Sequence, residues 1–193
     1  VTMGDGGLGI GGAHLLSTCR RNIDLTLLVL NNFNYGMTGG QCSSTTPQEA
    51  TVGSGFLNQI EKPMDVCKVS QAAGAAYTAR SSAYRKSLPE DIEQAIRFNG
   101  FSLIDIWGVC PGRYTKRNKL TPASIETQIS EMPPADGPVK ENQRPEYGSS
   151  YRQKASAQKV PAPPKPIEAR FSAPETGRQE VMILGSAGQR IVT

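Results

Sequence analysis

The sequence has 193 residues and a formal net charge of +4, with 21 Lys and Arg against 17 Asp and Glu spread along its length. No basic block resembles a nucleic-acid or membrane-surface patch, and no apolar run reaches the ~18 residues that a membrane span needs. We therefore expect a cytoplasmic protein of one domain with appendages, with no nucleic-acid and no membrane partner.

Short apolar strands alternate with helices through the first part of the sequence. The pattern predicts helices at 11–21, 65–73 and 89–98 and strands at 25–30, 76–79 and 101–107. Such alternation is typical of parallel βαβ units, so we expect an α/β fold in which helices flank a parallel sheet. Because Val1 stands at the end of a strand, we interpret the sheet as incomplete and the chain as an interior fragment or a partial gene product.

The composition changes after residue 114. Ten of the fourteen prolines lie between 112 and 178, among Ser, Gln, Lys and Glu. Such a composition favours an extended spacer, and we predict a Pro-rich linker at 115–178. An apolar run at 180–184 precedes a turn, which predicts the start of a further, truncated α/β domain at 179–193.

Two polar pairs mark the ends of the first two strands. Gly4-Asp5-Gly6 opens the first α/β unit, and Asn31-Asn32 closes the strand that follows, with Asn32 placed 27 positions after Asp5. This spacing is typical of enzymes that hold thiamine diphosphate through a divalent metal. A diphosphate needs a hard cation with oxygen ligands, typically octahedral Mg²⁺. We predict that Asp5, the side chain of Asn32 and the backbone carbonyl of Asn34 bind that ion.

The same glycines also fit a dinucleotide-binding fingerprint, Gly4-x-Gly6-x-x-Gly9. That motif needs an acidic residue at the end of the second strand, whereas Asp24 precedes this strand here. An aspartate inside the glycine turn would also repel a diphosphate unless a metal bridged them. The pattern therefore favours the metal-bound diphosphate, and a nicotinamide or flavin site and a ligand-free turn stay open as alternatives.

The likeness extends beyond these pairs. The matching runs lie at 4–16, 19–24, 30–41 and 45–47, and together they resemble the β subunit of the 2-oxoacid:ferredoxin oxidoreductases. The stretch Tyr35-Gly36-Met37-Thr38-Gly39-Gly40-Gln41 is more similar to the 2-oxoglutarate and branched-chain 2-oxoacid enzymes than to the pyruvate enzymes. The resemblance covers residues 1–114, which we interpret as the C-terminal part of a thiamine-diphosphate-binding domain.

The resemblance implies a cofactor site around the first turn and the loop after the second strand. Backbone N–H groups of the 6–11 turn would bind the diphosphate, and Met37 and Thr38 would lie beside the cofactor. The glutamate that activates the cofactor lies on the α subunit in this family, so the catalytic residues of this chain are unknown. The implied cofactor-binding residues are Gly4, Asp5, Gly6, Gly7, Ile10, Gly11, Asn32, Met37 and Thr38.

The four cysteines, Cys19, Cys42, Cys67 and Cys110, form no CxxC pair. Cys110 follows the last predicted strand, where ligands collect in open α/β sheets. The resemblance implies that Cys110 is one of the four thiolates of a [4Fe–4S] cluster, with the other three outside this sequence. A buried structural thiol stays open as the alternative. The single histidine, His14, has no assigned role.

The resemblance implies a β subunit that takes part in oxidative decarboxylation of a 2-oxoacid, with 2-oxoglutarate favoured, to acyl-CoA with reduction of ferredoxin. Its expected partners are the α subunit, ferredoxin, coenzyme A and the 2-oxoacid. We expect the 193-residue chain alone to be inactive, because it carries one cluster ligand at most and no activating glutamate.

Two other functions stay open. A non-oxidative thiamine-diphosphate decarboxylase or carboligase would share both polar pairs, and the chain could instead be a non-catalytic fragment that assembles with partners. Residues 179–193 resemble the start of the family's γ subunit, which would make the intact protein a β–γ fusion. The alternative is that this apolar strand matches by chance.

Overall fold

The structure is a computed structural model that describes residues 1–108, 112–159, 162–166, 168 and 177. It divides into two units, 1–158 and 159–193. The described residues of the second unit, all at 159 or beyond, contain no helix or strand. In the described parts of the chain, no helix has the length and apolar character needed to cross a bilayer.

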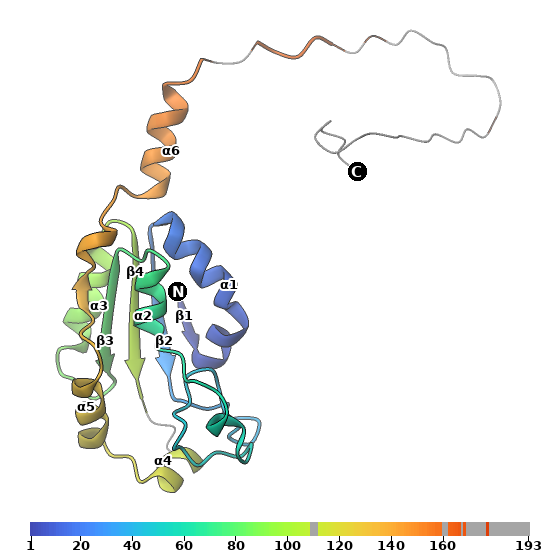
Figure 1. Cartoon of the computed structure of the whole chain (residues 1–193). Coiled ribbons are helices and arrows are strands. Elements are labelled where there is room, and N and C mark those ends of the chain that lie inside the picture. Colours follow the sequence, from blue (N-terminus) through green and yellow to red (C-terminus); the bar gives the residue numbers. More distant parts are fainter. Residues whose placement is uncertain (109–111, 160–161, 167, 169–176, 178–193) are drawn as a thin grey trace. The chain divides into compact units, whose positions relative to one another are not determined.

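A five-stranded sheet with the order β1-β2-β4-β3-β5 forms the centre of the first unit (Figure 1). The first four strands of that order pair in parallel, and β5 pairs antiparallel with β3. Because β3 lies beyond β4, the chain crosses over β4 and returns, as in doubly wound sheets. The strands are β1 (Thr2–Gly4), β2 (Leu25–Asn31), β3 (Tyr77–Ser82), β4 (Phe101–Trp107) and β5 (Asp136–Pro138).

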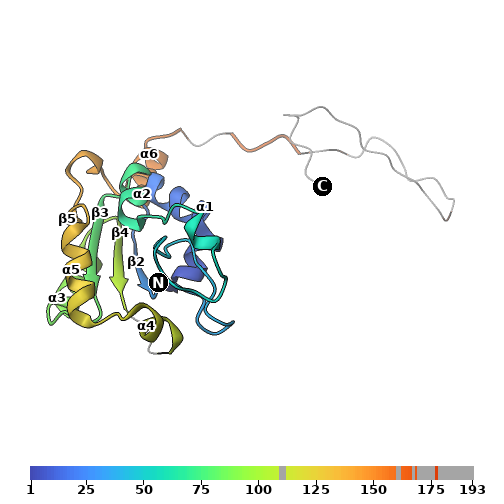
Figure 2. The same cartoon turned by 60° about the horizontal axis from the view of Figure 1, so that its bottom comes forward.

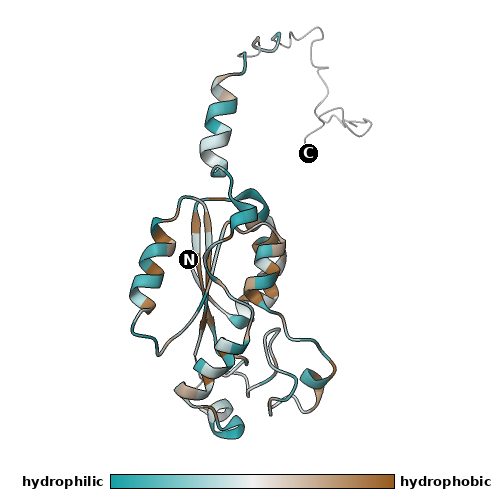
Figure 3. Cartoon of the chain, turned by 60° about the vertical axis from the view of Figure 1, so that its left-hand side comes forward, coloured by the Kyte–Doolittle hydropathy of each residue, from teal (hydrophilic) through white to brown (hydrophobic). Residues whose placement is uncertain are grey.

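Helices cover both faces of this sheet (Figure 2). One core cluster packs α1 (Asp5–Arg21) and α2 (Val66–Ala72) against Phe101 and Leu103 of β4. The opposite cluster packs α3 (Leu88–Arg97) against Ile104 and Ile106 of the same strand, because successive strand residues point to opposite faces. Figure 3 shows apolar strands between helices that carry both hydrophilic and apolar residues. The sheet and its helices confirm the predicted α/β fold.

The remaining helices do not belong to the two core clusters that cover the sheet with α1, α2 and α3. A third cluster joins Phe33 and Trp107 to Ile125 and Ile129 near the carboxyl ends of the strands. These elements are η1 (Leu57–Gln59), α4 (Arg113–Asn118), α5 (Pro122–Glu131), η2 (Lys140–Asn142) and α6 (Tyr147–Ser156).

The first helix begins earlier than the sequence pattern predicts. It starts at Asp5 directly after β1, so the expected glycine turn at 6–11 is helical. Its many glycines lower intrinsic helix propensity, but Leu8, Leu15 and Cys19 are buried against the sheet and stabilise the helix through packing. Tertiary packing therefore outweighs local propensity here.

Residues 115–158 differ from the expected extended spacer. Thr121 and Ser124 form a capping box at the start of α5, and Pro122 occupies its first turn, where a proline has no hydrogen bond to lose. Pro138 lies in the edge strand β5, another position that tolerates proline. The prolines here begin or border elements, so a proline-rich composition did not mean an unfolded segment. The predicted γ-like start at 179–193 lies outside the described residues.

Candidate metal and cofactor site

Three segments meet at the carboxyl ends of the parallel strands, the edge where ligands bind in open α/β sheets. Gly4 pairs with Leu30 across β1 and β2, so Asp5 and the Asn31-Asn32 pair leave the sheet at the same edge. Asn31 pairs with Trp107 of β4 on its other side. The parallel register therefore brings together the two motifs that are far apart in the sequence.

Asp5 is the first residue of α1 and is 3% exposed. Burial raises the pKa of Asp5 above its usual value, although hydrogen bonds from the Ser43 side chain and from the Asn34 backbone oppose this shift. One carboxylate oxygen, Oδ2, is buried without a hydrogen-bond partner. The helix N-terminus favours the ionised form, but an unpartnered buried oxygen still calls for a ligand.

Asn34 supplies a second oxygen of the same kind. Its Oδ1 atom is buried and has no hydrogen-bond partner, and its backbone N–H approaches Asp5. The backbone N–H of Asn34 also donates to Oδ1 of Asn32 at 3.3 Å, which directs that side chain along the same turn. The sequence predicted the carbonyl of Asn34 as a ligand, whereas the structure also leaves its side-chain oxygen free to bind.

These oxygens fit a hard divalent cation. Mg²⁺ prefers carboxylate, amide and carbonyl oxygens and leaves further positions for water and phosphate. No group of three or more His, Cys, Asp or Glu side chains forms a metal site within the described residues. A metal here would therefore bind one carboxylate, amide or backbone oxygens, and oxygens of the ligand itself.

The glycines beside Asp5 allow a tyrosine to lie across the first turns of α1. A Cβ at Gly6 would come within 2.9 Å of the Tyr35 ring, and one at Gly9 would come within 3.3 Å of its hydroxyl. N–H groups in the first turn of a helix have no partner within the helix. The Gly6 N–H contacts the Asp5 carboxylate, which leaves Gly7 as a donor for a diphosphate, whereas the N–H groups of later residues are used inside the helix.

Three predicted cofactor residues, Ile10, Met37 and Thr38, are exposed, unlike the buried Asp5 and Asn34. Ile10 is 92% exposed on α1, and the Met37 side chain is fully exposed. Thr38 donates to Gln41 Oε1 at 2.5 Å, inside a turn closed by the Tyr35 N–H and the Gln41 carbonyl at 3.0 Å. Gly11 has open space beside its Cα. Ile10, Met37 and Thr38 are therefore exposed on the surface of this chain, and their place beside the cofactor stays a prediction.

Sequence reasoning missed a buried polar network on the same edge. It joins Asn31 of β2 to Asp105 of β4 and to Arg80 of β3, all on the sheet face that α1 and α2 cover. Arg80 also pairs with Asp65 at the N-terminus of α2. No local motif marks these residues, because they come together only through the pairing of Arg80 and Val29 with Asp105.

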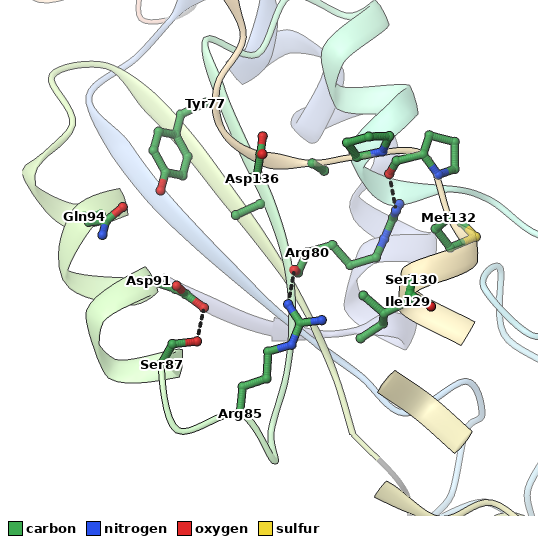
Figure 4. Close-up of a pocket in the computed structure, with 14 residues that line it drawn as sticks. Tyr77, Arg80, Arg85, Ser87, Asp91, Gln94, Ile129, Ser130, Met132 and Asp136 are labelled. Carbon is green, nitrogen blue, oxygen red and sulfur yellow. Dashed lines mark hydrogen bonds between the residues drawn. The ribbon is translucent and has the colours of Figure 1, made fainter. Parts of the chain in front are cut away.

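Of the cavities that adjoin Arg80, the two larger ones have different surroundings. One of about 370 Å³ is bordered by Asn31, Asp105 and Trp107, next to the turn that carries Asn32 and Asn34. The other, of about 340 Å³, lies between α3, β3 and the segment after α5 (Figure 4). In that view Arg80 donates to the Pro133 carbonyl at 3.0 Å, and its own carbonyl accepts from Arg85 at 3.5 Å.

Cys110, the predicted cluster ligand, lies outside the described residues. Cys19 and Cys67 are buried, and Cys42 is partly exposed. The expectation for Cys110 therefore stays a prediction.

Residues 1–106 match the model of a protein family, the C-terminal TPP-binding domain of thiamine pyrophosphate enzymes. The chain belongs to this family. The domain family explains why a Gly-Asp-Gly turn and an Asn-Asn pair lie at one sheet edge, and it favours thiamine diphosphate over the nicotinamide and flavin alternatives. It also confirms the fold predicted for the first part of the chain.

Curated relatives of this domain are subunits of 2-oxoacid oxidoreductases. The chain is 41% identical over 133 residues to 2-oxoglutarate synthase subunit KorB of Archaeoglobus fulgidus, covering 68% of this chain and 48% of the relative. It is 45% identical over 120 residues to the KorB subunit of Methanocaldococcus jannaschii, covering 61% and 44%. The β subunit of 2-oxoacid:ferredoxin oxidoreductase 2 of Aeropyrum pernix is 36% identical over 131 residues, covering 67% and 41%.

The predicted resemblance to this class of β subunit is thus confirmed, and the chain spans about half the length, or less, of these relatives. A solved 2-oxoglutarate:ferredoxin oxidoreductase from Magnetococcus marinus shares the fold, with a TM-score of 0.59 and 24% identity. That match covers 80% of this chain and 61% of the other.

Proposed function

We propose that this chain is part of the β subunit of a 2-oxoacid:ferredoxin oxidoreductase and binds thiamine diphosphate through Mg²⁺. The two buried, unpartnered oxygens of Asp5 and Asn34 at the N-terminus of α1 carry the proposal. The names of the curated relatives favour 2-oxoglutarate as the substrate, converted to acyl-CoA and CO₂ with transfer of the electrons to ferredoxin.

The residues of this chain would hold and orient the cofactor. Asp5 would supply the charged metal ligand, and Asn32 and Asn34 the neutral oxygens. The N–H group of Gly7, and that of Gly6 beside the Asp5 carboxylate, would donate to the diphosphate at the positive end of α1. When bound, thiamine diphosphate supplies the electron sink for decarboxylation of the 2-oxoacid.

Groups outside this sequence would complete the site. We propose that the α subunit supplies the carboxylate that activates the cofactor. Cys110 would be one of the four thiolates of a [4Fe–4S] cluster that passes electrons to ferredoxin. Coenzyme A would accept the acyl group, which requires access to the cofactor near the exposed Met37 and Ile10.

The metal site is tested by Asp5→Asn, which keeps the shape of the side chain and removes its charge. In the complete enzyme with its partner subunits, the Mg²⁺-dependent affinity for thiamine diphosphate should fall by about 100-fold or more, because a charged ligand is lost. Calorimetric titration measures this affinity. Asp24→Asn is the matched control, since Asp24 is exposed and lies beyond the other end of α1.

Unchanged cofactor affinity in Asp5→Asn would exclude the metal assignment. With 2-oxoglutarate and coenzyme A, the wild-type enzyme should reduce ferredoxin and form an acyl-CoA. Release of an aldehyde without ferredoxin reduction would instead support the non-oxidative alternative.

A further inference from the structure

The turn that carries the proposed metal ligands contains an unusual backbone conformation. Phe33, between Asn32 and Asn34, has a φ of 62°. A residue with a Cβ is unfavourable in this left-handed region and stays there only when its surroundings hold it. The position of both proposed ligands therefore depends on what holds Phe33.

Two hydrogen bonds to its backbone and the packing of its ring hold this residue. Its N–H donates to Oδ1 of Asn31 at 3.3 Å, and its carbonyl accepts from Thr46 Oγ1 at 2.6 Å. Its ring packs edge-on against Trp107 with the ring centres 4.9 Å apart. The contact from Asn31 acts on the backbone N–H of Phe33, between the two proposed ligands Asn32 and Asn34, so the orientation of the Asn31 amide matters most for the turn.

Asp105 sets that orientation. An amide side chain has one donor end and one acceptor end, whereas an ionised carboxylate only accepts. Nδ2 of Asn31 donates to Asp105 Oδ1 at 3.1 Å, which turns Oδ1 of Asn31 toward Phe33. Thr45 Oγ1 donates to that same Oδ1 atom at 2.8 Å and supports the orientation.

Asp105 is held in turn from two sides and is 2% exposed. The indole N–H of Trp107 donates to Oδ2 at 2.7 Å, and Nε of Arg80 lies 3.7 Å from the same oxygen. Arg80 is itself buried, and its Nε has no hydrogen-bond partner. Burial raises the pKa of Asp105 to about 6, and the hydrogen bonds and Arg80 oppose that rise. Because one oxygen accepts from Asn31 and the other from Trp107, with Arg80 nearby, these neighbours favour the ionised carboxylate.

We propose that Asp105 is a positioning residue for the metal-binding turn. Its carboxylate orients the amide of Asn31, Asn31 holds Phe33 in its left-handed conformation, and that conformation presents Asn32 and Asn34 to the metal. The inference rests on the proposed function, because it assigns Asp105 a role in the same Mg²⁺–thiamine diphosphate site.

The test is Asp105→Asn, which keeps the volume of the side chain. Asp105 accepts one hydrogen bond from Asn31 and one from Trp107, whereas an asparagine has only one acceptor end. In the variant, the side-chain NH₂ group would therefore face a second donor, either Nδ2 of Asn31 or the indole N–H of Trp107. If the Asn31 amide turned over to avoid this clash, its Oδ1 would no longer accept from the Phe33 N–H. The measurement is calorimetric titration of thiamine diphosphate into the complete enzyme at a series of Mg²⁺ concentrations.

We expect Asp105→Asn to need about 10-fold more Mg²⁺ for half-maximal cofactor binding, as is typical for residues that orient metal ligands. The number of cofactor sites at saturating Mg²⁺ should be unchanged, which a general loss of fold would not give. Thr45→Val is a milder second variant that leaves Asp105 intact and removes the supporting bond to Asn31, together with the hydroxyl contact to Ser43 Oγ at 3.2 Å. It should shift the Mg²⁺ dependence in the same direction by a smaller factor.

Ser102→Ala is the matched control. Ser102 is buried on the same strand, β4, and its hydroxyl donates to the Ala95 carbonyl at 2.7 Å, far from the metal turn. It should lower thermal stability without changing the Mg²⁺ dependence. A wild-type Mg²⁺ dependence in Asp105→Asn, or an equal shift in Ser102→Ala, would overturn the role of Asp105. Cofactor binding by the wild type without any need for Mg²⁺ would overturn the metal site itself, and the inference with it.

Discussion

Asp5 and Asn34 each bury an oxygen that forms no hydrogen bond, which is costly in a folded protein. Because the backbone of Asn34 approaches the Asp5 carboxylate, one cation could satisfy both oxygens. Binding to the folded state alone would then also stabilise the domain. The same two atoms that weaken the free chain are thus the ones that would select a hard cation.

At the residue scale the sequence predicted one part of this site and missed another. The sequence placed Asp5 and Asn32 at one edge of the sheet because both residues directly follow strands, and the register of β1 against β2 agrees with this placement. Asp105 and Arg80 gave no such signal, because each lies inside a strand where apolar residues are expected. Arg80 and Asp105 are neighbours only because β3 pairs with β4 in this register. A short stretch of sequence around either residue does not predict which residues of the two strands pair.

The cysteines provide a residue-scale prediction. Burial raises the pKa of Cys19 to about 11, and burial raises the pKa of Cys67 well above its usual value. Thiolates react and thiols do not, so both side chains should resist alkylation in the native chain. Iodoacetamide labelling at pH 8 followed by peptide mass spectrometry should show modification at Cys42, which is partly exposed, at least about 10-fold faster. Equal rates at Cys19 and Cys42 before unfolding would contradict the buried placement of Cys19.

At the element scale, two glycines of this chain differ in whether the surrounding structure leaves space for a side chain. Gly100 has a φ of 138°, and a Cβ there would come within 2.6 Å of Oδ1 of Asn22. That oxygen accepts from the Phe101 N–H at 2.9 Å at the start of β4. Gly12 lies within α1 with no atom within 4 Å of a built Cβ. One glycine is therefore required by its surroundings, and the other only lowers helix propensity.

We expect Gly100→Ala to reduce the free energy of unfolding by about 2 kcal/mol or more, since it strains the backbone and displaces Asn22. Gly12→Ala should raise it by about 0.5–1 kcal/mol through helix propensity. Urea denaturation of the full chain, followed by circular dichroism, measures both. If both substitutions shifted stability in the same direction, the distinction between the two glycines would be wrong.

Element prediction worked where apolar periodicity dominates. The strand at 101–107 agrees with the structure because its apolar residues contact both faces of the sheet. It was less accurate at β3, where Arg80 and two serines extend a buried strand beyond the expected end at residue 79. It missed β5 because Pro138 and Gly137 are not strand formers, and their strand pairs only with the edge of β3.

At the scale of the whole molecule, the segment after α5 packs against the C-terminal ends of helices α1 and α2. The guanidinium of Arg144 donates to the carbonyls of Cys19 at 2.6 Å and Gly74 at 2.7 Å, beside the ends of α1 and α2. Asn142 donates to the carbonyls of Gln71 and Ala75. Carbonyls at helix ends lack partners within the helix, so this segment satisfies them. These contacts explain why residues beyond the matched family domain belong to the first structural unit.

This arrangement predicts where the chain can be shortened. A chain that ends after Gln158 keeps the hydrogen bonds of Asn142 and Arg144, which all lie within residues 1–158. It should therefore unfold at the same temperature as the full chain. A chain that ends after Met132 loses these bonds and strand β5. At about 1 kcal/mol for each buried hydrogen bond, its free energy of unfolding should fall by about 3 kcal/mol or more.

The comparison is made by thermal unfolding monitored by circular dichroism, with Arg144→Met in the full chain as the matched single change. That variant keeps a long side chain but loses the donors to Cys19 and Gly74, so its unfolding temperature should lie between those of the two shortened chains. If ending the chain after Gln158 were as destabilising as ending it after Met132, the first unit would depend on residues beyond 158. If neither change had an effect, the segment from β5 to α6 would not be needed for the stability of the domain.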